Sequence, residues 1–102
     1  FGDGAAVEGG FHEALNLTSL WHLPVVFVCQ NNLYGLSQPW ERTAYKCDLA
    51  QRARSYHIRG ECVNGMDAID VYHSVDKAVQ LARSGGGPSF IEAKTYRYRG
   101  HY

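Results

Sequence analysis

Two short polar segments near the start of the chain carry residue types that could bind a metal ion and a phosphate. Gly2-Asp3-Gly4 places a carboxylate between two glycines, and Asn31-Asn32 follows a short apolar run. Glycines let the main chain approach a ligand closely, and the N–H groups that open a helix favour an anion such as phosphate. Because the Asp3 carboxylate would repel a bare phosphate, a metal ion between the two groups makes better sense.

The oxygen atoms of these segments suit magnesium. Mg²⁺ prefers roughly six oxygen ligands, and proteins usually supply only a few of them beside phosphates and water. Asp3 offers a carboxylate and Asn32 an amide oxygen. Each segment alone is an ordinary turn or loop pattern, so the hypothesis depends on their joint occurrence. The glycine spacing does not fit the dinucleotide-binding fingerprint, which disfavours a nicotinamide site.

Three helix patterns must help to position these segments. Apolar residues at helical spacing predict helices over about residues 8–21 and 69–83. Asp48 and Gln51 form a capping-box pattern, which predicts a third, short helix over about residues 49–56.

Strand patterns lie between the helices. They cover residues 25–29, 58–63 and 89–96. The first is wholly apolar and rich in β-branched residues, which predicts a strand covered on both faces. Residues 33–47 lack periodicity and form a candidate functional loop. The order of elements predicts an α/β fold, a parallel sheet with flanking helices, with Asp3 and Asn32 on adjacent strand ends where ligands bind.

Composition narrows the classes of function. The 102 residues, 45% hydrophobic and 20% charged, are typical of one globular domain at most. Ten Lys plus Arg balance ten Asp plus Glu, so we expect neither a nucleic acid nor a membrane as partner. The spacing of Cys29, Cys47 and Cys62 fits neither a disulfide framework nor a zinc site, and we expect reduced thiols.

An ordered series of motifs resembles a known family. The motifs are Gly2-Asp3-Gly4-Ala5-Ala6, Phe11-His12-Glu13-Ala14-Leu15-Asn16, Leu23-Pro24, Asn31-Asn32-Leu33-Tyr34-Gly35, Gly65-Met66-Asp67, Gly87-Pro88 and Thr95-Tyr96-Arg97-Tyr98-Arg99-Gly100-His101. The first and fourth together resemble the thiamine-diphosphate-binding motif. The whole series is similar to the alpha subunit of the thiamine-dependent dehydrogenase component of 2-oxo acid dehydrogenase complexes, with pyruvate and acetoin dehydrogenases as the nearest members. The resemblance implies that residues 1–102 are a partial thiamine-diphosphate-binding domain, an internal segment of a longer protein.

The resemblance also implies a cofactor site. Asp3, the Asn32 side chain and the backbone carbonyl of Tyr34 would bind Mg²⁺. Gly4 and Ala5 would contact the diphosphate of thiamine diphosphate.

His101 is the one catalytic residue that the resemblance implies. It would contact the cofactor at the mouth of the site, where it transfers a proton or orients the substrate. The remaining histidines are expected to be structural or solvent-facing; they are His12, His22, His57 and His73. The glutamate that activates the cofactor would come from a partner subunit, so no glutamate of this chain, including Glu92 in the last strand pattern, is expected in that role.

The implied activity is the oxidative decarboxylation of a 2-oxo acid, pyruvate first, or the cleavage of acetoin, with acyl transfer to a lipoyl carrier. The implied partners are a beta subunit in an α2β2 heterotetramer and a lipoyl acyltransferase component. Asp3 in place of Glu favours the pyruvate and acetoin groups over branched-chain oxo acids. Tyr102 stands where animal pyruvate dehydrogenases carry a regulatory phosphoserine, which favours a bacterial cytoplasm over a mitochondrial matrix. Alone, the chain is expected to be inactive and to aggregate.

Two alternatives remain beside this hypothesis. A non-catalytic structural or regulatory remnant of the same fold would have no physical need for Asp3, Asn32 and His101 together. Another thiamine enzyme, such as a transketolase, would share the Gly-Asp-Gly turn but not the motif at residues 96–101.

Overall fold

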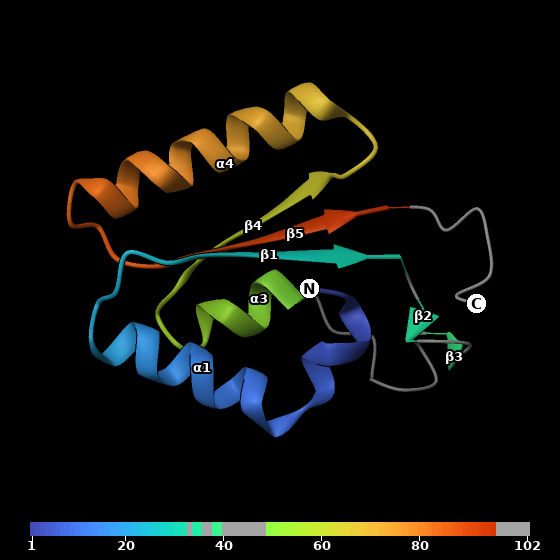
Figure 1. Ribbon diagram of the computed structural model, residues 1–102, viewed down its shortest axis with the longest axis horizontal. Coiled ribbons are helices and arrows are strands. Elements are labelled where there is room, and N and C mark those ends of the chain that lie inside the picture. The colour runs from blue at the N-terminus through green and yellow to red at the C-terminus, as the bar shows by residue number, and fades with distance from the viewer. Residues whose placement is uncertain (33, 36–37, 40–48, 96–102) are drawn as a thin grey trace.

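A parallel three-stranded sheet with helices on both faces forms the centre of the computed structural model (Figure 1). The structure describes residues 1–32, 34–35, 38–39 and 49–95. In chain order the elements are the 3-10 helix η1 (Asp3–Val7), α1 (Gly9–Leu20), β1 (Val26–Asn31), β2 (Tyr34–Gly35), β3 (Gln38–Pro39), α3 (Leu49–Arg54), β4 (Arg59–Asn64), α4 (Ala68–Arg83) and β5 (Ser89–Lys94). The predicted α/β class with a parallel sheet is confirmed.

The strands of the sheet lie in the order β1, β5, β4. The first residues of the chain add a further position beside β1, on the edge opposite β5. The Phe1 amino group donates to the Val28 carbonyl at 2.9 Å, and the Gln30 N–H donates to the Phe1 carbonyl at 2.7 Å. Gly2 and Gln30 then form a parallel bridge. The Gly-Asp-Gly turn therefore leaves the sheet directly beside the end of β1.

The helices occupy both faces of the sheet because the chain reverses its direction across it. The connections from Gly2 to β1 and from β1 to β4 cross the sheet in the same direction, and their helices α1 and α3 lie on one face (Figure 1). From β4 to β5 the chain moves back, and α4 lies on the opposite face. Right-handed crossovers in opposite directions require this arrangement. Among the described residues, no helix is long and apolar enough to span a bilayer.

Two apolar clusters hold the layers together. The first cluster lies where α1 and α3 pack on the sheet. It contains the buried side chains of Leu15, Cys29, Leu49, Ile58 and Phe90 with their smaller neighbours. The second lies where α4 packs on the sheet and contains those of Val63, Ala78, Ile91 and Ala93. Both clusters take side chains from β5, which is therefore the central strand.

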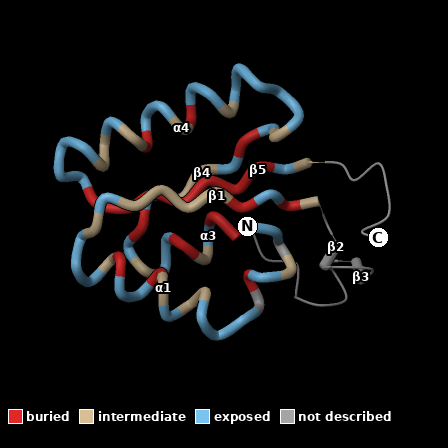
Figure 2. The backbone as a smooth tube through the Cα atoms, in the orientation of Figure 1, coloured by how far each residue is buried: buried red, intermediate tan, exposed pale blue. Residues whose placement is uncertain are grey.

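Burial corrects one expectation about β1. Val26, Phe27 and Val28 are only half-buried, whereas Ser89 to Ala93 of β5 are all buried (Figure 2). The apolar run alone predicted a strand covered on both faces. The strand order explains the difference, because β5 has a full strand on each side and β1 has one full strand and the short Phe1–Gly2 segment.

A side-chain cap begins α4. The Asp67 carboxylate caps α4 by accepting hydrogen bonds from the N–H groups of Ile69 and Asp70, at 3.0 and 3.3 Å. The short third helix is observed as α3, and its expected cap, Asp48, lies outside the described residues.

Candidate functional site

The carboxyl ends of the three main strands lie in one row. Asn31 of β1 and Asn64 of β4 are each in register with Lys94 of β5. Main-chain hydrogen bonds continue past this row, from the Thr95 N–H to the Asn31 carbonyl at 2.9 Å and from the Gly65 N–H to the Lys94 carbonyl at 2.8 Å. Ligands of parallel α/β sheets bind beyond such an edge, so this row marks where the candidate site lies.

The structure brings together the main chain of the expected metal-binding residues. Asp3 follows Gly2, which is bridged to Gln30 near the end of β1, and Asn32 directly follows β1. Tyr34 begins β2, which lies against η1. The expected adjacency of the Gly-Asp-Gly turn and the Asn-Asn end of β1 is therefore present. Of the side chains, only that of Asn32, which is half-buried, falls within the described part of the structure.

The Gly-Asp-Gly turn leads into a separate 3-10 helix and not directly into α1. Asp3, Gly4 and Ala5 belong to the five-residue 3-10 helix η1, and α1 begins only at Gly9. A 3-10 helix of this length carries little macrodipole, so close approach of the main chain matters more here than the field of a long helix.

The donor set at this edge is chemically suited to Mg²⁺. A carboxylate, an amide oxygen and a main-chain carbonyl are hard oxygen ligands, and a small number of them leaves positions for phosphate oxygens and water. Zinc sites typically take three or four ligands from Cys, His, Asp and Glu side chains. The described part of the chain holds no group of three or more His, Cys, Asp or Glu side chains that could hold a metal. These residues fit a magnesium site in which protein oxygens and diphosphate oxygens would together bind the metal.

Two of the histidines make contacts within the fold, His57 and His73 are exposed, and one histidine lies outside the described residues. That one is His101, together with the whole of residues 96–102. His12 Nδ1 is 3.2 Å from the Tyr56 hydroxyl, and His22 Nε2 is 2.9 Å from the Gly85 carbonyl. Both contacts join elements within the fold.

Glu92, two residues before the end of β5, contacts this row through Asn31, and sequence analysis missed it. It lies in the central strand β5 and is 1% exposed. Its Oε2 accepts a hydrogen bond from Asn31 Nδ2 at 2.8 Å, and its Oε1 accepts one from the Ala50 N–H at 3.1 Å. The available signal was a carboxylate inside an apolar strand pattern, because a buried charge requires partners.

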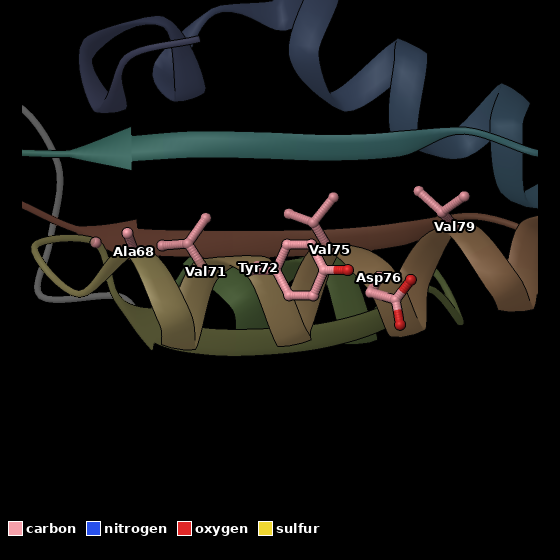
Figure 3. A pocket seen from close by; sticks show the side chains of 7 residues that line it. Ala68, Val71, Tyr72, Val75, Asp76 and Val79 are labelled. Carbon is pink, nitrogen blue, oxygen red and sulfur yellow. The ribbon is translucent and has the colours of Figure 1, made fainter.

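A separate hollow lies along α4. Val71, Val75 and Val79 project from one side of the helix toward the side of β1 (Figure 3). The hollow has a volume of about 540 Å³, and its other lining residues are Gly65, Ala68, Tyr72 and Asp76. It is almost wholly apolar and contains none of the expected cofactor ligands, so it is not a site for a diphosphate.

The strand order defines a parallel α/β domain, a class of fold in which ligands commonly bind at the carboxyl edge of the sheet. Residues 1–102 match the family model of the dehydrogenase E1 component, and the chain belongs to this family. This confirms the family resemblance of the motif series.

Named relatives agree with this membership. The chain is 49% identical over 102 residues to the alpha subunit of acetoin:2,6-dichlorophenolindophenol oxidoreductase from Bacillus subtilis (strain 168). This alignment covers 100% of this chain and 31% of the relative. It is 45% identical over 101 residues to the pyruvate dehydrogenase E1 component subunit alpha of Rhizobium meliloti (strain 1021), over 99% of this chain and 29% of the relative. The testis-specific mitochondrial form of the same subunit from Homo sapiens is 46% identical over 101 residues, 99% of this chain and 26% of the relative. The chain thus spans less than a third of the length of these relatives.

Proposed function

We propose that residues 1–102 are the part of a thiamine-diphosphate-dependent dehydrogenase alpha subunit that binds the diphosphate and Mg²⁺. One observation carries the proposal: the bridge between Gly2 and Gln30 sets the Gly-Asp-Gly turn beside the Asn-Asn end of β1. The family match over the whole chain supports the cofactor class.

In this proposal each residue has one task. Asp3, the Asn32 side chain and the Tyr34 carbonyl bind Mg²⁺, which in turn offsets the charge of the diphosphate. Gly4 and Ala5 let the main chain approach the diphosphate. The bound thiamine diphosphate supplies the nucleophilic carbon for cleavage next to a carbonyl group.

His101 completes the proposed set of residues. It orients the substrate or transfers a proton near the reacting centre, a task that positioned histidines commonly perform.

The proposed substrate is pyruvate, with acetoin as the second candidate. The names of the relatives from Rhizobium meliloti and Bacillus subtilis support these two compounds, respectively. We further propose that the chain works with a beta subunit in an α2β2 assembly and passes the acyl group to a lipoyl acyltransferase component. The word "subunit" in the names of the relatives supports an assembly of this kind. Dye reduction with pyruvate or with acetoin as the substrate separates the two candidates.

Calorimetric titration with thiamine diphosphate tests the cofactor site in the full alpha subunit assembled with its beta subunit. Asp3→Ala removes the only proposed anionic metal ligand, and we expect the Mg²⁺-dependent affinity to be lost. The matched control is Asp76→Ala, because Asp76 is an exposed carboxylate on α4, hydrogen-bonded to Gln80 at 3.0 Å. Wild-type affinity in Asp3→Ala would refute the proposed site and favour a non-catalytic role.

A further inference from the structure

The carboxylate of Glu92 sits between two segments that the chain separates widely. Asn31 ends β1, and Ala50 is the second residue of α3. Glu92 accepts one hydrogen bond from each, with Asn31 Nδ2 at 2.8 Å from Oε2 and the Ala50 main-chain nitrogen at 3.1 Å from Oε1. One side chain of the central strand therefore holds the residue before and the residue after segment 32–49.

Burial makes hydrogen-bond partners important for both side chains. Glu92 is 1% exposed and Asn31 is 4% exposed. A carboxylate removed from water is stable only if donors replace the lost hydration, and an ionised carboxylate can only accept hydrogen bonds. In the structure the amide nitrogen of Asn31 faces Glu92, as suits a carboxylate acceptor, and this contact orients the Asn31 side chain.

Asn31 is thereby fixed through its side chain and its main chain alike. The side chain binds Glu92, and the carbonyl accepts from the Thr95 N–H at 2.9 Å. Both partners belong to β5 or follow it directly. The next residue is Asn32, so its starting position is set by two contacts to the central strand.

We propose that Glu92 is a positioning residue that fixes Asn32 for metal binding by holding Asn31 and the start of α3. This inference rests on the proposed function, because it assumes that Asn32 binds Mg²⁺. Glu92 touches neither the metal nor the cofactor in this role. Groups that orient metal ligands from behind typically change metal affinity roughly ten- to a hundredfold when they are replaced.

Exchanging the amide of Asn31 and the carboxylate of Glu92 tests whether the contact between them affects Mg²⁺ binding. Asn31→Asp sets two carboxylates against each other, and we expect Mg²⁺ affinity to fall roughly tenfold or more. Glu92→Gln can keep the Ala50 contact through its carbonyl oxygen, but its amide group meets the Asn31 amide until the latter rotates, so a smaller loss is expected. In the double variant Asn31→Asp/Glu92→Gln, the amide at 92 donates to the carboxylate at 31 and its oxygen still accepts from Ala50. We expect this exchange to restore affinity to within about threefold of the wild type, which is strong coupling between neighbours.

The measurements are made on the full alpha subunit assembled with its beta subunit. The first is the dissociation constant of Mg²⁺ at saturating thiamine diphosphate, and the second is the melting temperature without metal and cofactor. Glu61→Gln is the matched control, because Glu61 is a half-buried glutamate of β4, paired with Arg59 at 3.2 Å and remote from Asn31 in the sheet order. We expect wild-type Mg²⁺ affinity from it.

Three outcomes would overturn the inference while leaving the proposed function intact. They are wild-type Mg²⁺ affinity in both single variants, a double variant in which the losses add, and a fall in melting temperature with no change in Mg²⁺ affinity. If Asn31→Asp does not fold, the comparison of Glu92→Gln with the double variant still decides, since only coupling makes the double variant the better binder. Asp3→Ala, measured in parallel, separates the two claims: retained cofactor affinity in that variant refutes the site itself.

Discussion

Gly2 and Gln30 are neighbours in a parallel bridge, so the chain leaves the sheet at Asp3 beside the point where β1 ends. The main chain of Asp3, which begins one connection, and that of Asn32, which begins another, thus leave the sheet at the same edge. Neither segment is distinctive alone, because glycine turns and asparagine loops are common. Their adjacency in the fold is what makes a metal and diphosphate site chemically reasonable.

Chelation should separate metal-dependent from direct cofactor binding. Removing divalent metal with EDTA should lower the affinity for thiamine diphosphate, because the Asp3 carboxylate then repels the diphosphate instead of sharing a cation with it. Added Mg²⁺ should restore the affinity in calorimetric titration. Asp3→Ala should respond much less to either treatment. Equal affinity with and without metal in the wild type would argue against a bridging cation.

Removing the cap of α4 should loosen the first turn of that helix. Asp67 accepts hydrogen bonds from the N–H groups of Ile69 and Asp70. Replacing an N-cap aspartate with alanine typically costs about 0.5–2 kcal/mol, and Asp67→Ala should speed exchange of these two amides roughly two- to thirtyfold. Hydrogen exchange on the assembled enzyme measures the exchange rates of the two amides. Asp76→Ala, in the middle of the same helix, should leave the first turn unchanged.

Gly60 should not tolerate a side chain. A Cβ at this position of β4 would lie 2.2 Å from the Ala50 carbonyl oxygen, which belongs to the main chain of α3. Gly60→Ala therefore has to push α3 away from the sheet, and overpacking of this kind costs about 1–3 kcal/mol.

The melting temperature of the assembled enzyme measures this effect. Gly10→Ala is the control, because a Cβ there meets nothing within 4 Å and alanine is the better helix former in α1. We expect a fall in melting temperature for Gly60→Ala and none for Gly10→Ala. Equal melting temperatures for the two variants would contradict the close approach of α3 to β4.

Local patterns were sufficient to place the main elements. The helical spacing of apolar residues indicated helices at 8–21 and 69–83. They are observed as α1 and α4, and no helix end differs from the prediction by more than one residue. Asp67 and the glycines after Arg83 mark the ends of α4 through direct chemistry, and Gly85 and Gly87 adopt positive φ angles of 84° and 85°. Such signals depend on neighbours in sequence, which is why they can be recognised without a structure.

Strand order could not be obtained in the same way. That β5 lies between β1 and β4 is a property of pairing between distant segments, and the apolar run of β1 was the more obvious candidate for the central strand. The contacts of Glu92 could not be predicted for the same reason, since its partners Asn31 and Ala50 come from elements far from it in sequence. The role of His101 depends on the family resemblance and on residues outside the described part of the chain.

A crystal structure of the assembled enzyme with thiamine diphosphate and Mn²⁺ in place of Mg²⁺ tests the central claim most directly. The anomalous signal of Mn²⁺ locates the metal without reference to the protein model. We predict a single peak at the carboxyl edge of the sheet, within about 2.0–2.3 Å of an Asp3 carboxylate oxygen, the Asn32 amide oxygen and the Tyr34 carbonyl oxygen. A metal bound to the diphosphate but to none of these three residues would contradict the account.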